Sequence, residues 1–135
     1  MAMSTDHSFG ERWAGLAALP PARQQAAMGP ILDDVLRLEA KGRRAAMVDM
    51  VNAEYGLDEA ALHRFTASRL RAWLALAADH LHAAETIAEE YDDVFDALPG
   101  AIAMRRTMVM QSVARSALAP DEIARLTQVS RSILG

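Results

Sequence analysis

The 135-residue chain contains no cysteine, and aromatic side chains make up only 5% of its residues. The absence of cysteine excludes disulfides, thiolate metal sites and cysteine nucleophiles, and it is typical of a reducing compartment, so we expect a cytoplasmic protein. Alanine is abundant whereas β-branched and aromatic residues are few, a composition that favours helices over sheets. We therefore predict an all-α fold.

Long apolar runs are also missing. The longest one, residues 72–78, is about a third of the roughly 20 residues that a membrane-spanning helix needs, so no membrane association is expected. The first nine residues do not show a basic segment followed by an apolar one, and no signal peptide is predicted.

The chain has little positive charge. Its net charge is −4, and Lys41 is the one lysine among 14 basic residues. Because attraction to phosphate dominates affinity for DNA and RNA, this balance disfavours nucleic acid as a partner.

Proline and glycine divide the chain into five or six expected helices within one domain of residues 1–135, of which residues 1–7 are expected to be flexible. Ser8 and Glu11 have the spacing of a capping box that opens the first helix. Further along, Gly29 and Pro30 predict an interruption and Gly42 predicts another, although the segments on either side of Gly42 could also form one bent helix.

The most informative segment runs from Asp58 to Leu98 without proline or glycine. As one helix it would be a rod of about 60 Å, whereas a domain of this length has a diameter of about 37 Å. Either the helix breaks near Asp79, or a second subunit covers the excess length and its apolar stripe. The stripe residues that we predict to take part in an interaction are Phe65, Trp73, His80, Ile87 and Tyr91.

Charge along this segment favours the second option. Basic residues lie in its first half and acidic residues fill its second half, so two copies paired antiparallel would bring Arg71 near Glu85 and Arg64 near Asp92. We therefore predict a homodimer. The alternative is a monomer in which these charges form a solvated helix face, since exposed ion pairs contribute only about 0 to 1 kcal/mol.

A second interaction surface is predicted on the helix of residues 101–118. Arg105 and Arg106 stand beside Met108 and Met110, and arginine and methionine are enriched at adaptable protein interfaces. A buried helix from which the two arginines extend to the surface explains the same pattern.

No catalytic constellation is recognisable. The serines lie in segments predicted to be helical, without the strained glycine turn that exposes a nucleophile, and no glycine-rich phosphate loop is present. Glu-x-x-His repeats of a di-iron bundle are absent. His80 together with Met104 or Met108 could ligate haem, whereas a histidine bonded to its neighbours explains His80 equally well. We expect no enzyme, no cofactor and no metal.

The segment of residues 120–134 resembles the helix-turn-helix of bacterial regulators. Glu122, Ile123 and Ala124 match its first helix, and Val129 and Ser130 match the start of the recognition helix. Gln128 departs from the glycine that usually occupies the turn, and the recognition helix that remains before Gly135 is short. The resemblance implies DNA binding, to whose phosphates Arg125 and Arg131 would contribute.

The sequence thus predicts a bundle of five or six helices around a long central helix at residues 58–98, either continuous or broken near residue 79. Its expected role is a non-catalytic interaction or regulatory module that binds an unidentified protein partner as a homodimer. A DNA-binding regulator that uses residues 120–134 and a helical bundle that holds haem or a metal are the alternatives.

Overall fold

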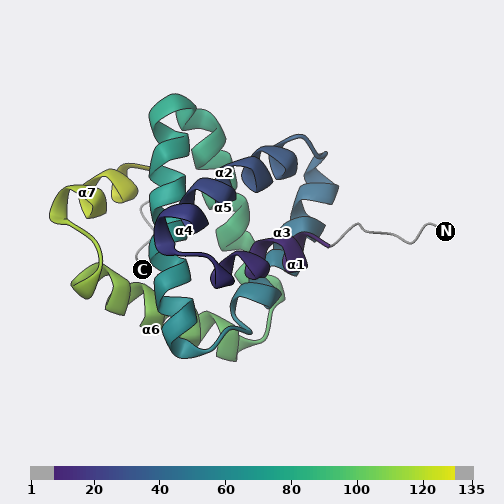
Figure 1. Cartoon of the computed structure of the whole chain (residues 1–135). Helices are drawn as coiled ribbons and strands as arrows, with labels where there is room; N and C mark the ends of the chain where they lie inside the picture. The colour runs from purple at the N-terminus through teal and green to yellow at the C-terminus, as the bar shows by residue number, and fades with distance from the viewer. Residues whose placement is uncertain (1–7, 130–135) are drawn as a thin grey trace.

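A computed structural model describes residues 8–129, and in this range the chain forms seven α-helices and two short 3-10 helices without any strand (Figure 1). The predicted all-α fold is confirmed. The α-helices are α1 (Phe9–Ala14), α2 (Pro21–Leu36), α3 (Ala40–Glu54), α4 (Glu59–Asp79), α5 (Leu81–Val94), α6 (Gly100–Ser116) and α7 (Pro120–Val129). The 3-10 helices are η1 (Gly15–Ala18) and η2 (Phe95–Ala97). The expectation of a flexible start concerns residues 1–7, which lie outside the described range.

The first helix begins as predicted. The hydroxyl of Ser8 accepts a hydrogen bond from the backbone N–H of Glu11 at 3.1 Å, and the Glu11 carboxylate accepts one from the backbone N–H of Ser8. This capping box satisfies two of the backbone donors that the first turn leaves without a helical partner.

Two predicted interruptions are wrong. Helix α2 continues through Gly29 and Pro30, and Gly42 lies inside α3. Pro30 removes one backbone hydrogen bond, but Met28 and Ile31 on either side of it are buried, and their burial outweighs this loss. The actual boundary between α2 and α3 lies at residues 37–39.

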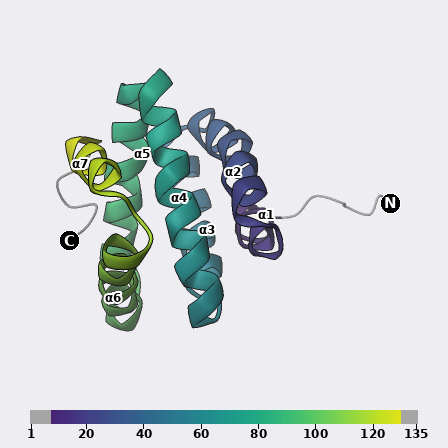
Figure 2. The same ribbon diagram turned by 60° about the vertical axis from the view of Figure 1, so that its left-hand side comes forward.

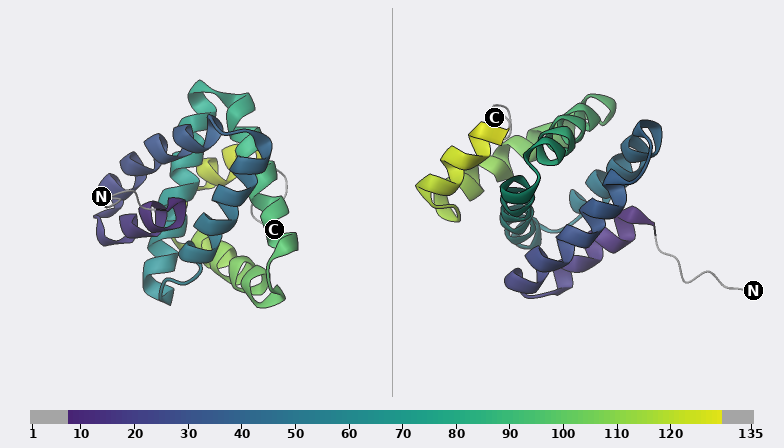
Figure 3. Two further views of the ribbon diagram at one scale, coloured as in Figure 1. Left: turned by 90° about the vertical axis from the view of Figure 1, so that its right-hand side faces the viewer. Right: turned by 90° about the horizontal axis from the view of Figure 1, so that it is seen from above.

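The long helix predicted over residues 58–98 breaks at His80. The backbone of His80 has φ −144° and ψ 73°, which is not helical, so α4 ends at Asp79 and α5 starts at Leu81. The break thus falls next to the predicted position, although the Asp79 side chain does not cap α5. Helix α5 then folds back along α4, as Figure 1 and the left view of Figure 3 show.

Helix α4 is the centre of the fold. It packs against α2, α5, α6 and α7, and Figure 2 shows it standing between α2 on one side and α7 on the other. Aromatic rings join α4 to its neighbours edge to face. The centroids of Phe65 and Trp13 lie 5.4 Å apart, and those of Trp73 and Tyr91 lie 5.0 Å apart. No described helix is long and apolar enough to cross a membrane.

Candidate functional site

The apolar stripe that the sequence assigned to an interaction surface lies inside the chain. Because α5 folds back on α4, the stripe is covered by the chain's own helices, and this corrects the prediction. The predicted interaction residues with at most 4% exposure are Phe65, Trp73, Ile87, Tyr91 and Met110. His80 is exposed at the α4–α5 junction. The five buried residues stabilise the fold and present no surface to a partner.

A buried carboxylate holds this core together. Glu54, at the end of α3, is fully buried and accepts hydrogen bonds from Trp13 Nε1 at 2.9 Å, Arg69 Nε at 3.0 Å and Tyr91 Oη at 3.2 Å. The donors come from α1, α4 and α5, so a single side chain links four helices. The Glu54–Arg69 ion pair is satisfied by hydrogen bonds on both sides, as a buried pair must be.

Arg69 is enclosed by aromatic rings. Its guanidinium lies 4.7 Å from the centroid of Tyr91 and 5.0 Å from that of Trp73, distances typical of cation–π contacts. Burial alone would lower the pKa of Arg69, but attraction to Glu54 outweighs it and holds the pKa above its ordinary value. Burial raises the pKa of Tyr55 to about 12 and the pKa of Tyr91 well above its ordinary value. All these groups keep one protonation state at neutral pH, which suits a structural role.

Sequence reasoning missed this cluster, although a signal was present. Phe65, Arg69 and Trp73 follow each other at four-residue spacing, which places Arg69 on the buried stripe of α4. Arg69 is also one of the basic residues in the first half of the segment, which the sequence analysis considered only as a group. A basic residue in the middle of an apolar stripe predicts a buried acidic partner.

The candidate haem ligands are not brought together. His80 lies at the α4–α5 junction, and both Figure 1 and Figure 2 place α6, with Met104 and Met108, at the opposite end of the molecule. Among residues 8–129 there is no group of three or more His, Asp or Glu side chains that could hold a metal ion. His63 Nε2 lies 3.2 Å from the hydroxyl of Ser116, but this pair is exposed, and the hydroxyl donates to the carbonyl of Ser112.

Arg105 and Arg106 of α6 are both used within the chain. Arg105 donates hydrogen bonds to the carbonyl oxygens of Tyr55 and Leu57, at the end of α3. Arg106 pairs with Asp92 and lies 4.4 Å from the centroid of Phe95. The two arginines therefore attach α6 to the rest of the fold and are half-buried.

The opposite face of α6 is left exposed. Met104 and Met108 are 69% and 68% exposed, and together with Leu81 they are the large hydrophobic side chains that stand out from the described surface. The neighbouring exposed residues Ala101, Thr107 and Gln111 carry no charge. We call these five residues the methionine face.

A second surface feature is a groove of about 570 Å³ between α2 and α4. Two smaller hollows, of about 260 and 220 Å³, lie beside α4 and α7, and Gln25 of α2 also lines the first and Leu81 of α5 the second. Ala75 and Ala78, both exposed, form a ridge of α4 beside the groove and the hollows, and Gln25 and Ala75 line both the groove and the larger hollow. We call this surface the α2–α4–α7 face. The residues that line the groove are Ala22, Gln25, Ala26, Gly29, Leu32, Asp33, Ala72, Ala75, Leu76, Asp79 and His80.

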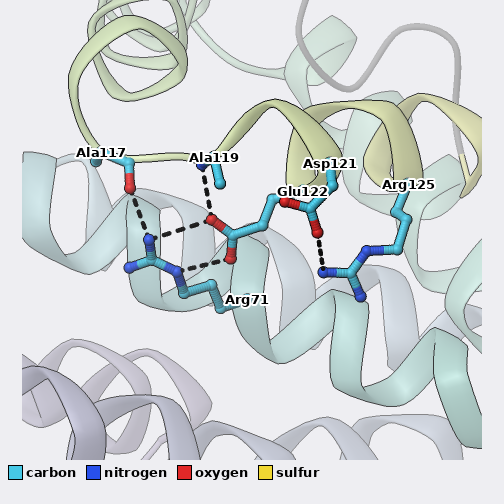
Figure 4. Close-up of polar contacts among 6 residues, drawn as sticks. All are labelled: Arg71, Ala117, Ala119, Asp121, Glu122 and Arg125. Carbon is cyan, nitrogen blue, oxygen red and sulfur yellow. Dashed lines mark hydrogen bonds and ion pairs between the residues drawn. The ribbon is translucent and has the colours of Figure 1, made fainter.

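Helix α7 is fixed to α4 by a charged contact (Figure 4). Arg71 donates to both carboxylate oxygens of Glu122, at 3.0 and 3.3 Å, and to the carbonyl of Ala117 at 2.6 Å. Glu122 also accepts the backbone N–H of Ala119 at 2.9 Å. Hydrogen bonding to Arg71, and then to Ala119, lowers the pKa of Glu122. The predicted dimer contact of Arg71 with Glu85 is thus replaced by a contact within the chain, and Asp92 pairs with Arg106 instead of Arg64 of another copy.

The resemblance of residues 120–134 to a helix-turn-helix is not matched by the geometry. Gln128, the expected turn position, lies inside α7, which continues without a break from Pro120 to Val129. The predicted recognition helix beyond Val129 lies outside the described residues. No family model matches the chain, and no match to it was found among the curated proteins or the solved structures.

Proposed function

We propose that this protein is a non-catalytic interaction module that binds another protein through the methionine face of α6. The observation that carries the proposal is the pairing of Met104 and Met108. They are four residues apart, lie on the same side of one helix and are each about two-thirds exposed. Two large apolar side chains side by side on a surface are a feature of binding sites, whereas single ones are ordinary.

The chemistry of this face indicates the kind of partner. The side chain of methionine is flexible and polarisable, so it adapts to irregular apolar surfaces. Because no exposed charge lies between Ala101 and Gln111, the partner surface needs to be apolar and uncharged at its centre. An apolar groove that receives α6 as a helix fits this description.

The backbone of α6 is suited to this role because it is held in place. Arg105 and Arg106 bind it to α3 and α5, and Met110 and Val113 are buried beneath it. A helix that is ordered before binding loses little conformational entropy when the partner arrives.

Photo-crosslinking in the native host tests the proposal. A photoreactive amino acid placed at position 104 or 108 should give the same covalent adduct with one partner protein, and the same substitution at Ala45, exposed on α3, should not. The variant M104E/M108E should lose the partner in a pull-down and keep its helical circular dichroism. If neither position gives an adduct, or if position 45 gives the same one, the proposal is wrong.

The homodimer predicted from the sequence stays a prediction. The stripe on which it depended is covered by the chain itself, so a dimer needs another surface.

A further inference from the structure

We infer that the α2–α4–α7 face is where two copies of this chain associate, about a twofold axis that runs along the ridge of α4. In this arrangement α7 of each copy lies over the groove between α2 and α4 of the other copy. The inference does not depend on the methionine face, since α6 lies toward the other end of α4 (Figure 2).

The two sides of the ridge differ in charge. Asp33 and Asp79 line the groove on the α2 side, and within the described part of the chain neither carboxylate takes part in an ion pair or a hydrogen bond. The hollows on the α7 side are lined by Arg71, Arg125 and the Glu122 carboxylate that Arg71 neutralises. The α2 side therefore carries two uncompensated negative charges. On the α7 side Arg71 pairs with Glu122 and Arg125 pairs with Asp121, so the charges there balance, and Arg125, in the longer of the two pairs, is the cation that a further carboxylate could attract.

The position of the acids adds to this imbalance. Asp79 is the last residue of α4, and Asp33 lies in the last turn of α2. The C-terminal end of a helix is already partly negative, so an acid there is unfavourable, and neither helix has a basic residue in its last turn. A cation from outside the chain would remove this repulsion.

A twofold axis along the ridge supplies such a cation. Rotation about it exchanges the two sides, so that the α2 side of one copy meets the α7 side of the other. Arg125 borders both hollows, which share Leu74 and Ala78 of α4, so it lies near the last turns of α4, where Asp79 also lies. Each copy thus brings Arg125 opposite Asp79 of the other copy, and the contact is made twice. The existing contact of Arg125 with Asp121, at 3.4 Å and with both side chains more than half exposed, is weak.

The ridge itself has the side chains that this symmetry requires. Residues on a twofold axis meet their own copies, so they need to be small and uncharged, as Ala75 and Ala78 are. Leu81, which is 53% exposed beside the α7 hollow, would be covered. A standard interface takes roughly 800 Å² from each partner, which is about a tenth of the chain's 7403 Å² surface, and a face spanning three helices can supply it.

Charge exchange tests this arrangement directly. Sedimentation equilibrium of the full chain, over about 1 to 300 µM, should show a monomer–dimer equilibrium, as expected for a modest interface. Asp79→Arg and Arg125→Asp should each raise the dissociation constant at least tenfold, because each places like charges opposite one another. The combined variant D79R/R125D restores opposite charges and should return the constant to within about threefold of the original.

Two further variants keep the result unambiguous. Ala75→Glu puts two carboxylates against each other on the axis and should abolish the dimer, whereas Arg115→Asp, at an exposed arginine of α6, should leave it unchanged. Far-ultraviolet circular dichroism confirms that each variant is folded. The inference is overturned if the unmodified chain is monomeric throughout, if the single reversals have no effect, or if the double reversal fails to restore association.

Discussion

The buried ion pair of Glu54 and Arg69 allows a sharp prediction. Glu54→Gln keeps the size of the side chain and one acceptor oxygen but removes the negative charge, leaving the Arg69 guanidinium buried without a counter-ion. Breaking a buried pair in this way costs about 3–5 kcal/mol. Since small domains are stable by only about 5–15 kcal/mol, the loss should be visible in any unfolding experiment.

Urea unfolding, followed by circular dichroism, measures this loss as a change in the free energy of unfolding at constant m-value. Glu90→Gln is the matched control. The Arg43–Glu90 pair is slightly shorter, at 2.8 Å against 3.0 Å, but its side chains retain 21% and 23% exposure instead of 2% and 0%. We expect a loss of at most about 1 kcal/mol there.

The double variant E54L/R69M separates the charge from the packing. Replacing both members of a buried pair by apolar residues of similar size is often neutral or stabilising, so this variant should be clearly more stable than E54Q. The reasoning is refuted if E54Q loses less than about 1 kcal/mol, or if its loss equals that of E90Q.

Three further predictions follow from the same contacts. The pKa of Tyr55 is about 12 in the folded chain and about 10 in the unfolded chain, so the stability that Tyr55 contributes is complete below pH 10. Above pH 10 the free energy of unfolding should fall by about 1.4 kcal/mol per pH unit, and Tyr55→Phe should reduce this slope. The pKa of Glu122 is lowered in the folded chain, so the stability that Glu122 contributes is present above its unfolded pKa and is lost as the pH falls through the folded value. Glu122→Gln should cost about 1 kcal/mol at pH 7, and the free energy of unfolding of this variant should change less steeply with pH in the acid range. Gly10→Ala should cost about 1–3 kcal/mol in thermal unfolding, since its Cβ would lie 2.7 Å from the Asp49 carbonyl oxygen, whereas Gly15→Ala, with open space and a helical backbone, should be neutral or stabilising.

How far the sequence predicts this fold depends on the type of signal. Composition and periodicity were sufficient for the all-α class, and the spacing of Ser8 and Glu11 identified the first helix start. Glycine and proline were less reliable, because Gly29, Pro30 and Gly42 all lie inside helices. A single helix breaker costs about 1–3 kcal/mol, which the burial of neighbouring side chains can outweigh.

The break at His80 could be anticipated but not decided. Nothing in the local residues forbids a continuous helix there. A break was expected only because a helix over residues 58–98 would be longer than the diameter of a domain of this size. The choice between folding back and pairing with a second copy depends on tertiary contacts, above all those of Glu54, which lies in another helix. Met108 and Met110 were predicted together as interaction residues, but Met108 is exposed, whereas Met110, two residues later, faces the core.

The fold-back at His80 is the claim on which both proposed surfaces depend, and a distance measurement tests it directly. The chain has no cysteine, so cysteines at the exposed positions Glu59 and Asp93 can carry a pair of spin labels without further changes. A continuous helix would separate these positions by about 51 Å. The ring of Phe95 lies 5.6 Å from that of Tyr55, so the folded-back chain predicts a separation below about 30 Å. A dominant distance near 50 Å would contradict the account.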